Sequence, residues 1–273
     1  MANLRIGWRN IFDVATLTAS PALVTTLPET NLQKQERFKT ARSTSLASQD
    51  WKASWSSAQR FNYVFMRMHN FTAAAQQRTR TYTDSAFTTG LVDNVAANCF
   101  GYTGFSVNDV LTEADFRLLK NSARYLSLIT NLQSLNLTTT DAANPDGHME
   151  ISRLFGGEYF EMSYNIPYSD AQFLFEDFST QSRVYDGSVI SDKGAKGRKI
   201  LLRNELCAPA DWNALLSGLR SVGKDKDFFI SILPENGTYL EAYFQGLVKV
   251  ADAGMFDRHF VGIARLPITL IES

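Results

Sequence analysis

The sequence predicts a mainly β protein, with an N-terminal β-sandwich of the jelly-roll type followed by a second β-sandwich that carries one flanking α-helix. Two observations support this fold class. Phe, Tyr and Trp make up 12% of the 273 residues, and aromatic side chains suit the pleated, half-buried surface of a sheet. Short strand-like runs also recur between turn signals at the ~8–12-residue spacing typical of sandwiches and jelly rolls.

The first domain is expected at residues 1–167. Trp51, Trp55 and Phe61 flank a polar loop, and Asn144-Pro145-Asp146-Gly147 predicts a turn. Residues 84–122 contain several glycines and are expected to form an insertion outside the sheet, with a short helix that begins at Thr112. The predicted strands of this domain are 11–18, 61–69, 77–83, 124–130 and two short strands within 149–164.

The second domain is expected at residues 168–273 and begins with a long hairpin. Two extended runs, 173–185 and 198–206, flank a segment rich in glycine and lysine. This composition predicts a flexible tip that stays outside the domain's own core and could reach another subunit. The residues singled out at the tip are Gly187, Lys193, Gly194, Lys196 and Gly197.

A helix is predicted over residues 209–222. Pro209 suits the first turn of a helix and Gly223 its end. Strands are expected after it at 228–233, 240–250 and 260–271. The helix prediction depends on one apolar stripe with helical spacing, formed by Trp212, Leu215, Leu216, Leu219 and Val222.

The composition argues against several classes of partner. Lys and Arg total 27 against 28 Asp and Glu, which gives a net charge of -1 and no global field to attract a nucleic acid. No stretch approaches the ~18 apolar residues of a membrane span, and the N-terminus shows no secretory signal. We therefore expect folding in a cytoplasm, with no membrane partner. Cys99 and Cys207 are expected to be buried free thiols.

No catalytic, cofactor or metal motif is recognisable. The phosphate-binding, nucleophile-elbow and zinc-helix patterns are missing from the sequence, and its histidines lack a second ligand at zinc spacing. His148 lies in a turn near Asp146 and Glu150, which leaves weak cation binding open. Glu158 and Glu161 leave a glycosidase interpretation open, although spacing alone does not support it. The sequence therefore predicts a protein that is not an enzyme and has no cofactor.

Carbohydrate binding is the stronger ligand hypothesis. Sandwich-type binding modules stack sugars on exposed aromatic rings, and Trp51, Trp55 and Tyr102 lie in predicted loops where they could do this. The alternative is that these tryptophans fill the core, because an indole buries a large apolar area.

The order of several segments in the first ~165 residues resembles galactose-binding-like jelly rolls found in tail proteins of tailed bacteriophages. The resembling segments are Ile11–Ser20, Leu27–Leu32, Phe38–Ser43, His69–Thr72 and Ile151–Gly157. In such proteins a Trp often precedes the Arg-Ser pair, where this chain has Ala41.

The last ~105 residues are similar to the ring-forming domain of phage tail-tube and distal tail proteins, on the pattern of long hairpin, helix 209–222 and the strand Phe228–Pro234. This resemblance implies a homo-oligomeric ring, sixfold by analogy, at the end of a tail tube. The partners it implies are further copies, tube and hub proteins, and DNA only as passing cargo; the location it implies is the virion tail.

Two function classes therefore stand. The first is a structural protein of a phage tail tip or baseplate, of the distal-tail type. The alternative is a carbohydrate-binding module for host adsorption on a virion, with a surface glycan as partner. A glycan hydrolase is a third interpretation without a supporting constellation of residues.

Overall fold

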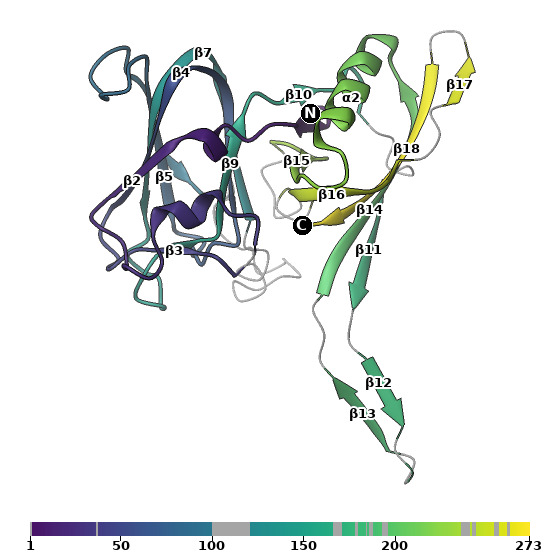
Figure 1. Ribbon diagram of the computed structural model, residues 1–273, viewed down its shortest axis with the longest axis horizontal. Coiled ribbons are helices and arrows are strands. Elements are labelled where there is room, and N and C mark those ends of the chain that lie inside the picture. Colours follow the sequence, from purple (N-terminus) through teal and green to yellow (C-terminus); the bar gives the residue numbers. More distant parts are fainter. Residues whose placement is uncertain are drawn as a thin grey trace. The chain divides into compact units, whose positions relative to one another are not determined.

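The computed structural model describes residues 2–36, 38–99, 121–165, 171–177, 180–183, 185, 188–192, 196–235, 241, 244–253, 257–260 and 263–273 (Figure 1). The predicted fold class is confirmed, because strands dominate and the described strand pairs are antiparallel. The chain divides into two compact units. Unit 1 comprises Met1–Glu161 and Phe228–Leu247, and unit 2 comprises Met162–Asp227 and Val248–Ser273. Each unit is thus built from two separate stretches, where the sequence suggested two consecutive domains.

Unit 1 contains a six-stranded sheet in the order β2 (Thr16–Ser20), β4 (Gln49–Arg67), β7 (Asn121–Thr140), β5 (Gln76–Tyr82) and β6 (Val92–Asn98), with β9 (Arg153–Gly157) also paired to β4. Strands β4 and β7 form its long centre, with Gln49 opposite Thr139 and Arg67 opposite Asn121. The predicted strands 61–69, 77–83 and 124–130 are confirmed within β4, β5 and β7.

Two smaller ladders complete unit 1. Strand β3 (Ala41–Arg42) pairs with β8 (Glu150–Ile151). Strand β1 (Arg5–Gly7) lies between β10 (Phe160–Glu161) and β15 (Phe228–Ser231), so residues from both stretches of the unit meet there. Two 3₁₀ helices, η1 (Ile11–Val14) and η2 (Glu29–Gln33), connect the early strands.

Three sequence predictions in unit 1 need correction. Residues 11–14 form η1, whose first turn is capped by the Asn10 side chain, so the strand begins only at Thr16. The expected loop around Trp51 and Trp55 is part of the continuous strand β4. Residues 92–98, expected outside the sheet, form β6 and pair with β5. The expected helix at Thr112 and the aromatic Tyr102 lie outside the described residues.

Unit 2 contains an antiparallel ladder in the order β16 (Gln245–Ala253, in this unit from Val248 onward), β18 (Ile263–Glu272), β14 (Lys196–Cys207) and β11 (Ala171–Asp177); β17 (Asp257–Phe260) also pairs with β18. The predicted hairpin is confirmed, because β11 and β14 pair from Ala171 opposite Leu202 to Asp177 opposite Lys196. Beyond them lies a two-stranded extension, β12 (Thr180–Arg183) and β13 (Val189–Asp192), which we call the arm (Figure 1).

Helix α2 spans Pro209–Val222, as predicted. Pro209 lies in its first turn, and Gly223 ends it with a φ of 58°. Leu215 and Val222 are buried, whereas Leu216 is 39% exposed, so the predicted stripe is narrower than expected. Asp211 is buried and accepts hydrogen bonds from the Ser163 amide (2.9 Å) and hydroxyl (2.8 Å). These bonds fix the start of the helix to the chain segment that follows β10.

Candidate functional site

The tryptophans proposed as sugar platforms lie inside unit 1. Trp51 and Trp55 are 1% and 3% exposed. The Trp51 indole N–H donates to Thr139 Oγ1 at 2.9 Å, and that of Trp55 donates to the Ile11 carbonyl at 2.7 Å. The prediction that they stand in exposed loops was wrong. Both rings fill the core, as the alternative interpretation held, and neither presents a face to a ligand.

The residues proposed for the hairpin tip are only partly described. Lys196 and Gly197 begin β14 and lie opposite Asp177 and Glu176, so they belong to the paired hairpin. Gly187, Lys193 and Gly194 lie outside the described residues. Their role in contacting another subunit stays a prediction.

A polar pocket of about 410 Å³ lies in unit 1, and we call it the Arg42 pocket. It is formed by the β3–β8 ladder, the segment that follows β4 and the turn that follows β7. The sequence singles out these pieces separately but gives no sign that they meet. The lining residues are Arg42, Met68, His69, Asn70, Asp146, His148 and Glu150.

Glu150 is the centre of the charges in the Arg42 pocket. Arg42 donates to Glu150 Oε2 from Nε at 2.8 Å and lies 2.7 Å from the same oxygen through Nη2. His148 Nε2 is 3.4 Å from that oxygen. These contacts all use Oε2, so Glu150 Oε1 receives no hydrogen bond from the described residues. The pocket therefore offers a ligand an open carboxylate oxygen beside a guanidinium and an imidazole.

Asn70 holds the turn in place. Its amide nitrogen donates to Asp146 Oδ2 (3.0 Å) and to the His148 carbonyl (2.9 Å), and its amide oxygen accepts from the Glu150 backbone N–H (2.8 Å). The predicted turn at 144–147 is confirmed, with Gly147 at a φ of 73°. The Asn70 amide thus orients the Asp146 side chain and fixes the backbone that carries Glu150.

Met68 adds backbone strain at the edge of the pocket. Its φ is 48°, a left-handed conformation that non-glycine residues seldom adopt. Such residues persist where the surrounding structure fixes them, and they cluster at binding sites. Here the strained residue directly follows β4 and brings His69 and Asn70 to the pocket.

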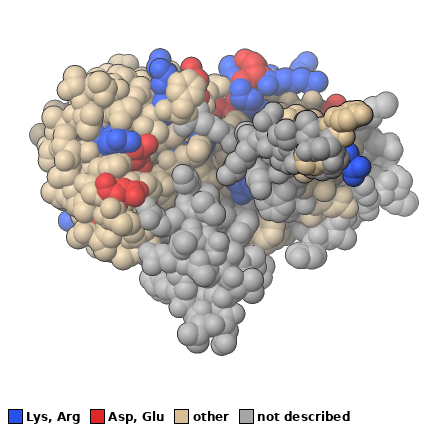
Figure 2. All heavy atoms as spheres, turned by 90° about the horizontal axis from the view of Figure 1, so that it is seen from below, with Lys and Arg blue, Asp and Glu red and all other residues tan. Residues whose placement is uncertain are grey.

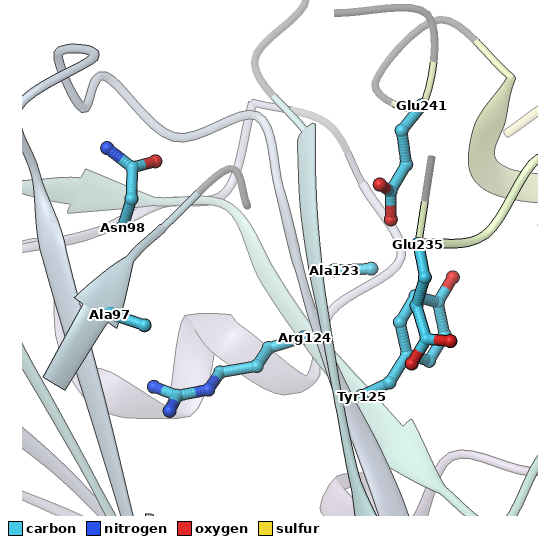
Figure 3. Close-up of a pocket in the computed structure, with 7 residues that line it drawn as sticks. All are labelled: Ala97, Asn98, Ala123, Arg124, Tyr125, Glu235 and Glu241. Atoms are coloured by element: carbon cyan, nitrogen blue, oxygen red, sulfur yellow. The ribbon is translucent and has the colours of Figure 1, made fainter. Parts of the chain in front are cut away.

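A second pocket of about 290 Å³ in unit 1 is lined by β6, β7, Glu235 and Glu241 (Figure 3). The Arg124 guanidinium points away from both glutamates and donates to the carbonyls of Gln77 and Val95. Burial lowers the pKa of Arg124. Glu235 is held by Arg5 at 3.2 Å. These charges are engaged by the fold, so the Arg42 pocket is the better candidate for a ligand.

The side chains considered for catalysis are either paired with an arginine or buried. Arg60 binds Glu158 through two hydrogen bonds (2.5 and 2.7 Å) and lowers its pKa, the opposite of what a general acid requires. Glu161 pairs with Arg5 at 3.0 Å. Burial raises the pKa of the Cys99 thiol well above its usual range, which makes it a poor nucleophile. The described residues bring together no cluster of three metal-ligating side chains.

The described part of the chain contains no helix of the length and apolar character that would let it span a bilayer. On the face shown in Figure 2, basic and acidic side chains lie near one another, and the coloured atoms form no extended area of one sign. This agrees with the near-zero net charge of the sequence.

Neither protein-family models nor curated protein sequences match the chain. Among solved structures, chitosan-binding module 1 of a chitosanase/glucanase from Paenibacillus sp. IK-5 aligns over 55% of this chain and 99% of its own, with 13% identity and a TM-score of 0.42. CBM32-3 from a family 31 glycoside hydrolase of Clostridium perfringens aligns over 54% and 96%, with 14% identity and a TM-score of 0.38.

A fucose-binding module of Streptococcus pneumoniae, SpX-3, aligns over 56% of this chain and 99% of its own, with 7% identity and a TM-score of 0.37. All three TM-scores are below 0.5. The Arg42 pocket is a candidate ligand site because of the arrangement of its own side chains.

Proposed function

We propose that this protein is a non-enzymatic carbohydrate-binding protein whose unit 1 holds a glycan in the Arg42 pocket. The observation that carries the proposal is the open Glu150 Oε1 beside Arg42 and His148 in a pocket of about 410 Å³. That volume suits a small-molecule ligand. The convergent groups provide both donors and acceptors, which is what the hydroxyls of a sugar require.

The arrangement of side chains in the Arg42 pocket favours recognition of sugar hydroxyls over catalysis. Arg42 and Glu150 neutralise each other, and Asp146 Oδ2 accepts from Asn70. Side chains held in this way are already oriented before the ligand arrives, which reduces the ordering cost of binding. The site uses none of the tryptophans suggested by the sequence, so the aromatic stacking expected from Trp51 and Trp55 plays no part in it.

A glycan array followed by calorimetry on the best ligand tests this function. Arg42→Lys should weaken binding by about tenfold or more, because Lys cannot reproduce the planar two-nitrogen contact with Glu150. Arg60→Lys is the matched control, since Arg60 makes a similar pair with Glu158 on the same unit but outside the pocket. Glycan binding that is equal in both variants, or no glycan binding at millimolar concentration, would contradict the proposal.

A second function, self-assembly into a larger structure, is favoured by the arm. Among the described strands, β12 and β13 pair with each other and with no other strand. All four residues of β12 are exposed, and so is Tyr185 between the two strands. An isolated two-stranded hairpin is marginally stable in water, and its open edges are available to pair with another chain. An arm of this kind is suited to contact a further copy of the protein.

Under this second function the chain is a subunit of a bacteriophage tail tip or baseplate, a distal-tail-type ring of six copies in the virion. That assignment rests on the sequence resemblance together with the hairpin and helix of unit 2. Replacing residues 178–195 by a short turn would join Asp177 to Lys196, which lie opposite each other. The shortened chain should remain folded and lose assembly in light scattering. Assembly that is unaffected, or a full chain that is monomeric at all concentrations, would exclude this role for the arm.

A further inference from the structure

The acidic side chains of the Arg42 pocket outnumber its permanent cations. The lining residues include two carboxylates, Asp146 and Glu150, and one guanidinium, Arg42. Arg42, Asp146 and Glu150 together carry one positive and two negative charges, a net charge of −1. This excess is local, because the whole chain is almost neutral.

The guanidinium of Arg42, the one permanent cation among the lining residues, already binds an acceptor within the protein. Both Arg42 contacts go to Glu150 Oε2, at 2.8 and 2.7 Å. An incoming anion would have to compete with that carboxylate for the guanidinium while approaching Asp146 as well. The Glu150 side chain is only 20% exposed, so water screens its charge less than at an open surface. The pocket is therefore unfavourable for uronic or sialic acids.

The pocket is favourable for a ligand that carries a positive charge and donates hydrogen bonds. A protonated amine offers three donors and no acceptor, and ionised carboxylates are acceptors only. Hydrogen bonds between charged partners are stronger than those between neutral ones. Glu150 Oε1, which receives no bond from the described residues, is placed to accept one from such an amine.

We propose that the Arg42 pocket selects amino sugars with a free amine over their N-acetylated or acidic counterparts, a specificity that rests on the glycan-binding function proposed above. Asp146 and Glu150 are the residues that determine it. Arg42 positions Glu150, and Asn70 positions Asp146 through the 3.0 Å amide hydrogen bond.

Calorimetry with two matched oligosaccharides tests the selectivity. A glucosamine oligomer and the same oligomer after N-acetylation share ring and linkage and differ in the amine. At about pH 5.5 and low salt, where the amines of a glucosamine oligomer are protonated and a carboxylate with an ordinary pKa is still ionised, the free-amine oligomer should bind about five- to tenfold more tightly. The preference should shrink as salt is raised.

Charge-removing variants make the test specific. In Glu150→Gln the preference for the amine should disappear and a uronic-acid oligomer should gain affinity, because Arg42 loses its carboxylate partner. Asp146→Asn should reduce the preference without affecting the Arg42 contact, and it keeps the test available if the first variant does not fold. Glu158→Gln, which removes an arginine-paired carboxylate outside the pocket, is the matched control and should leave the preference unchanged.

The outcomes separate the two proposals. Equal binding of the two oligomers, or tighter binding of the acidic oligomer to the parent protein, overturns the selectivity and leaves glycan binding standing. Binding of no oligosaccharide of any class overturns both. A free-amine preference that persists in Glu150→Gln and Asp146→Asn shows that it arises elsewhere and overturns the assignment to this pocket.

Discussion

Single residues in this protein are constrained by contacts that their own sequence neighbours do not reveal. Gly7 in β1 is an example. A Cβ at this position would lie 1.8 Å from the Tyr63 hydroxyl oxygen and 2.5 Å from its ring carbon Cζ. Tyr63 is fully buried and stacks on Phe229 with ring centroids 4.9 Å apart, so it has no room to retreat. Glycine is required at position 7 because of the ring above it.

Gly7→Ala should therefore lower the free energy of unfolding by about 1–3 kcal/mol, the usual cost of overpacking a core. Urea unfolding followed by fluorescence measures it. Tyr63→Phe should cost little, because the buried hydroxyl has no hydrogen-bond partner among the residues that the structure describes. Combining the two should recover part of the loss, since it removes the closest of the clashing atoms. A Gly7→Ala protein as stable as the parent would show that the ring can move.

The contribution of Asp84 to the stability of the fold depends on pH. It accepts hydrogen bonds from the Thr88 hydroxyl (2.5 Å) and the Thr89 amide (2.9 Å), which lower its pKa to about 2. Because the folded-state pKa lies below the ordinary value of 3.8, its contribution to stability is complete above that value and is lost as the pH falls through about 2.

Asp84→Asn should therefore lower the melting temperature at neutral pH, and the difference from the parent should vanish near pH 2. Thermal melts across this range measure the effect. Asp93→Asn is a useful comparison, because the pKa of Asp93 is lowered by its ion pair with Arg78 and its effect should weaken with added salt as well. A constant difference at all pH values would contradict the assigned cause.

At the scale of elements, a helix or strand was predicted correctly when the residues that indicate it lie within one segment of the chain. Helix α2 was predicted residue for residue, because its apolar spacing and its Pro and Gly boundaries lie within one segment. The alternation of buried and half-buried residues from Gln49 to Trp55 is equally regular. The polar residues flanked by Trp51, Trp55 and Phe61 nevertheless suggested a loop. The partner strand β7 lies far along the chain, so the pairing that makes this segment a strand could not be seen locally.

The Arg42 pocket could not be predicted for a related reason. Arg42, Asn70 and Glu150 come from three separate segments, and the β3–β8 pair that joins two of them is only two residues long. The sequence did single out His148 with Asp146 and Glu150 as a group near one turn. What it could not supply was the tertiary contact with Asn70, which orients that turn.

Helix α2 also provides a prediction for its own attachment. Asp211→Ala would remove the buried carboxylate that accepts from the Ser163 amide and hydroxyl, and we expect a loss of about 1–3 kcal/mol. Ser163→Ala removes the hydroxyl bond and keeps the amide bond, so it should cost less. Chemical denaturation of both variants compares the two costs. Equal costs would mean that the amide contact contributes nothing.

At the scale of the whole molecule, the discontinuity of unit 1 has a direct consequence. The sequence suggests a first domain at residues 1–167, but the second stretch of unit 1 supplies β15, which pairs with β1. It also supplies Phe229, whose ring lies 4.9 Å from those of both Tyr63 and Phe65 and is completely buried. A fragment that ends at 167 would expose this aromatic cluster to water.

We therefore expect the 1–167 fragment to melt well below the full chain, or to aggregate, because losing a buried Phe alone costs about 3–5 kcal/mol. Fusing residues 228–247 to the fragment through a flexible linker should restore a cooperative melt, because it returns both β15 and the aromatic contacts. The same fusion with Phe229→Ala is the control, and it should remain as unstable as the short fragment. If residues 1–167 alone unfold cooperatively at the temperature of the full chain, the second stretch contributes nothing to the stability of unit 1, and its grouping with that unit is wrong.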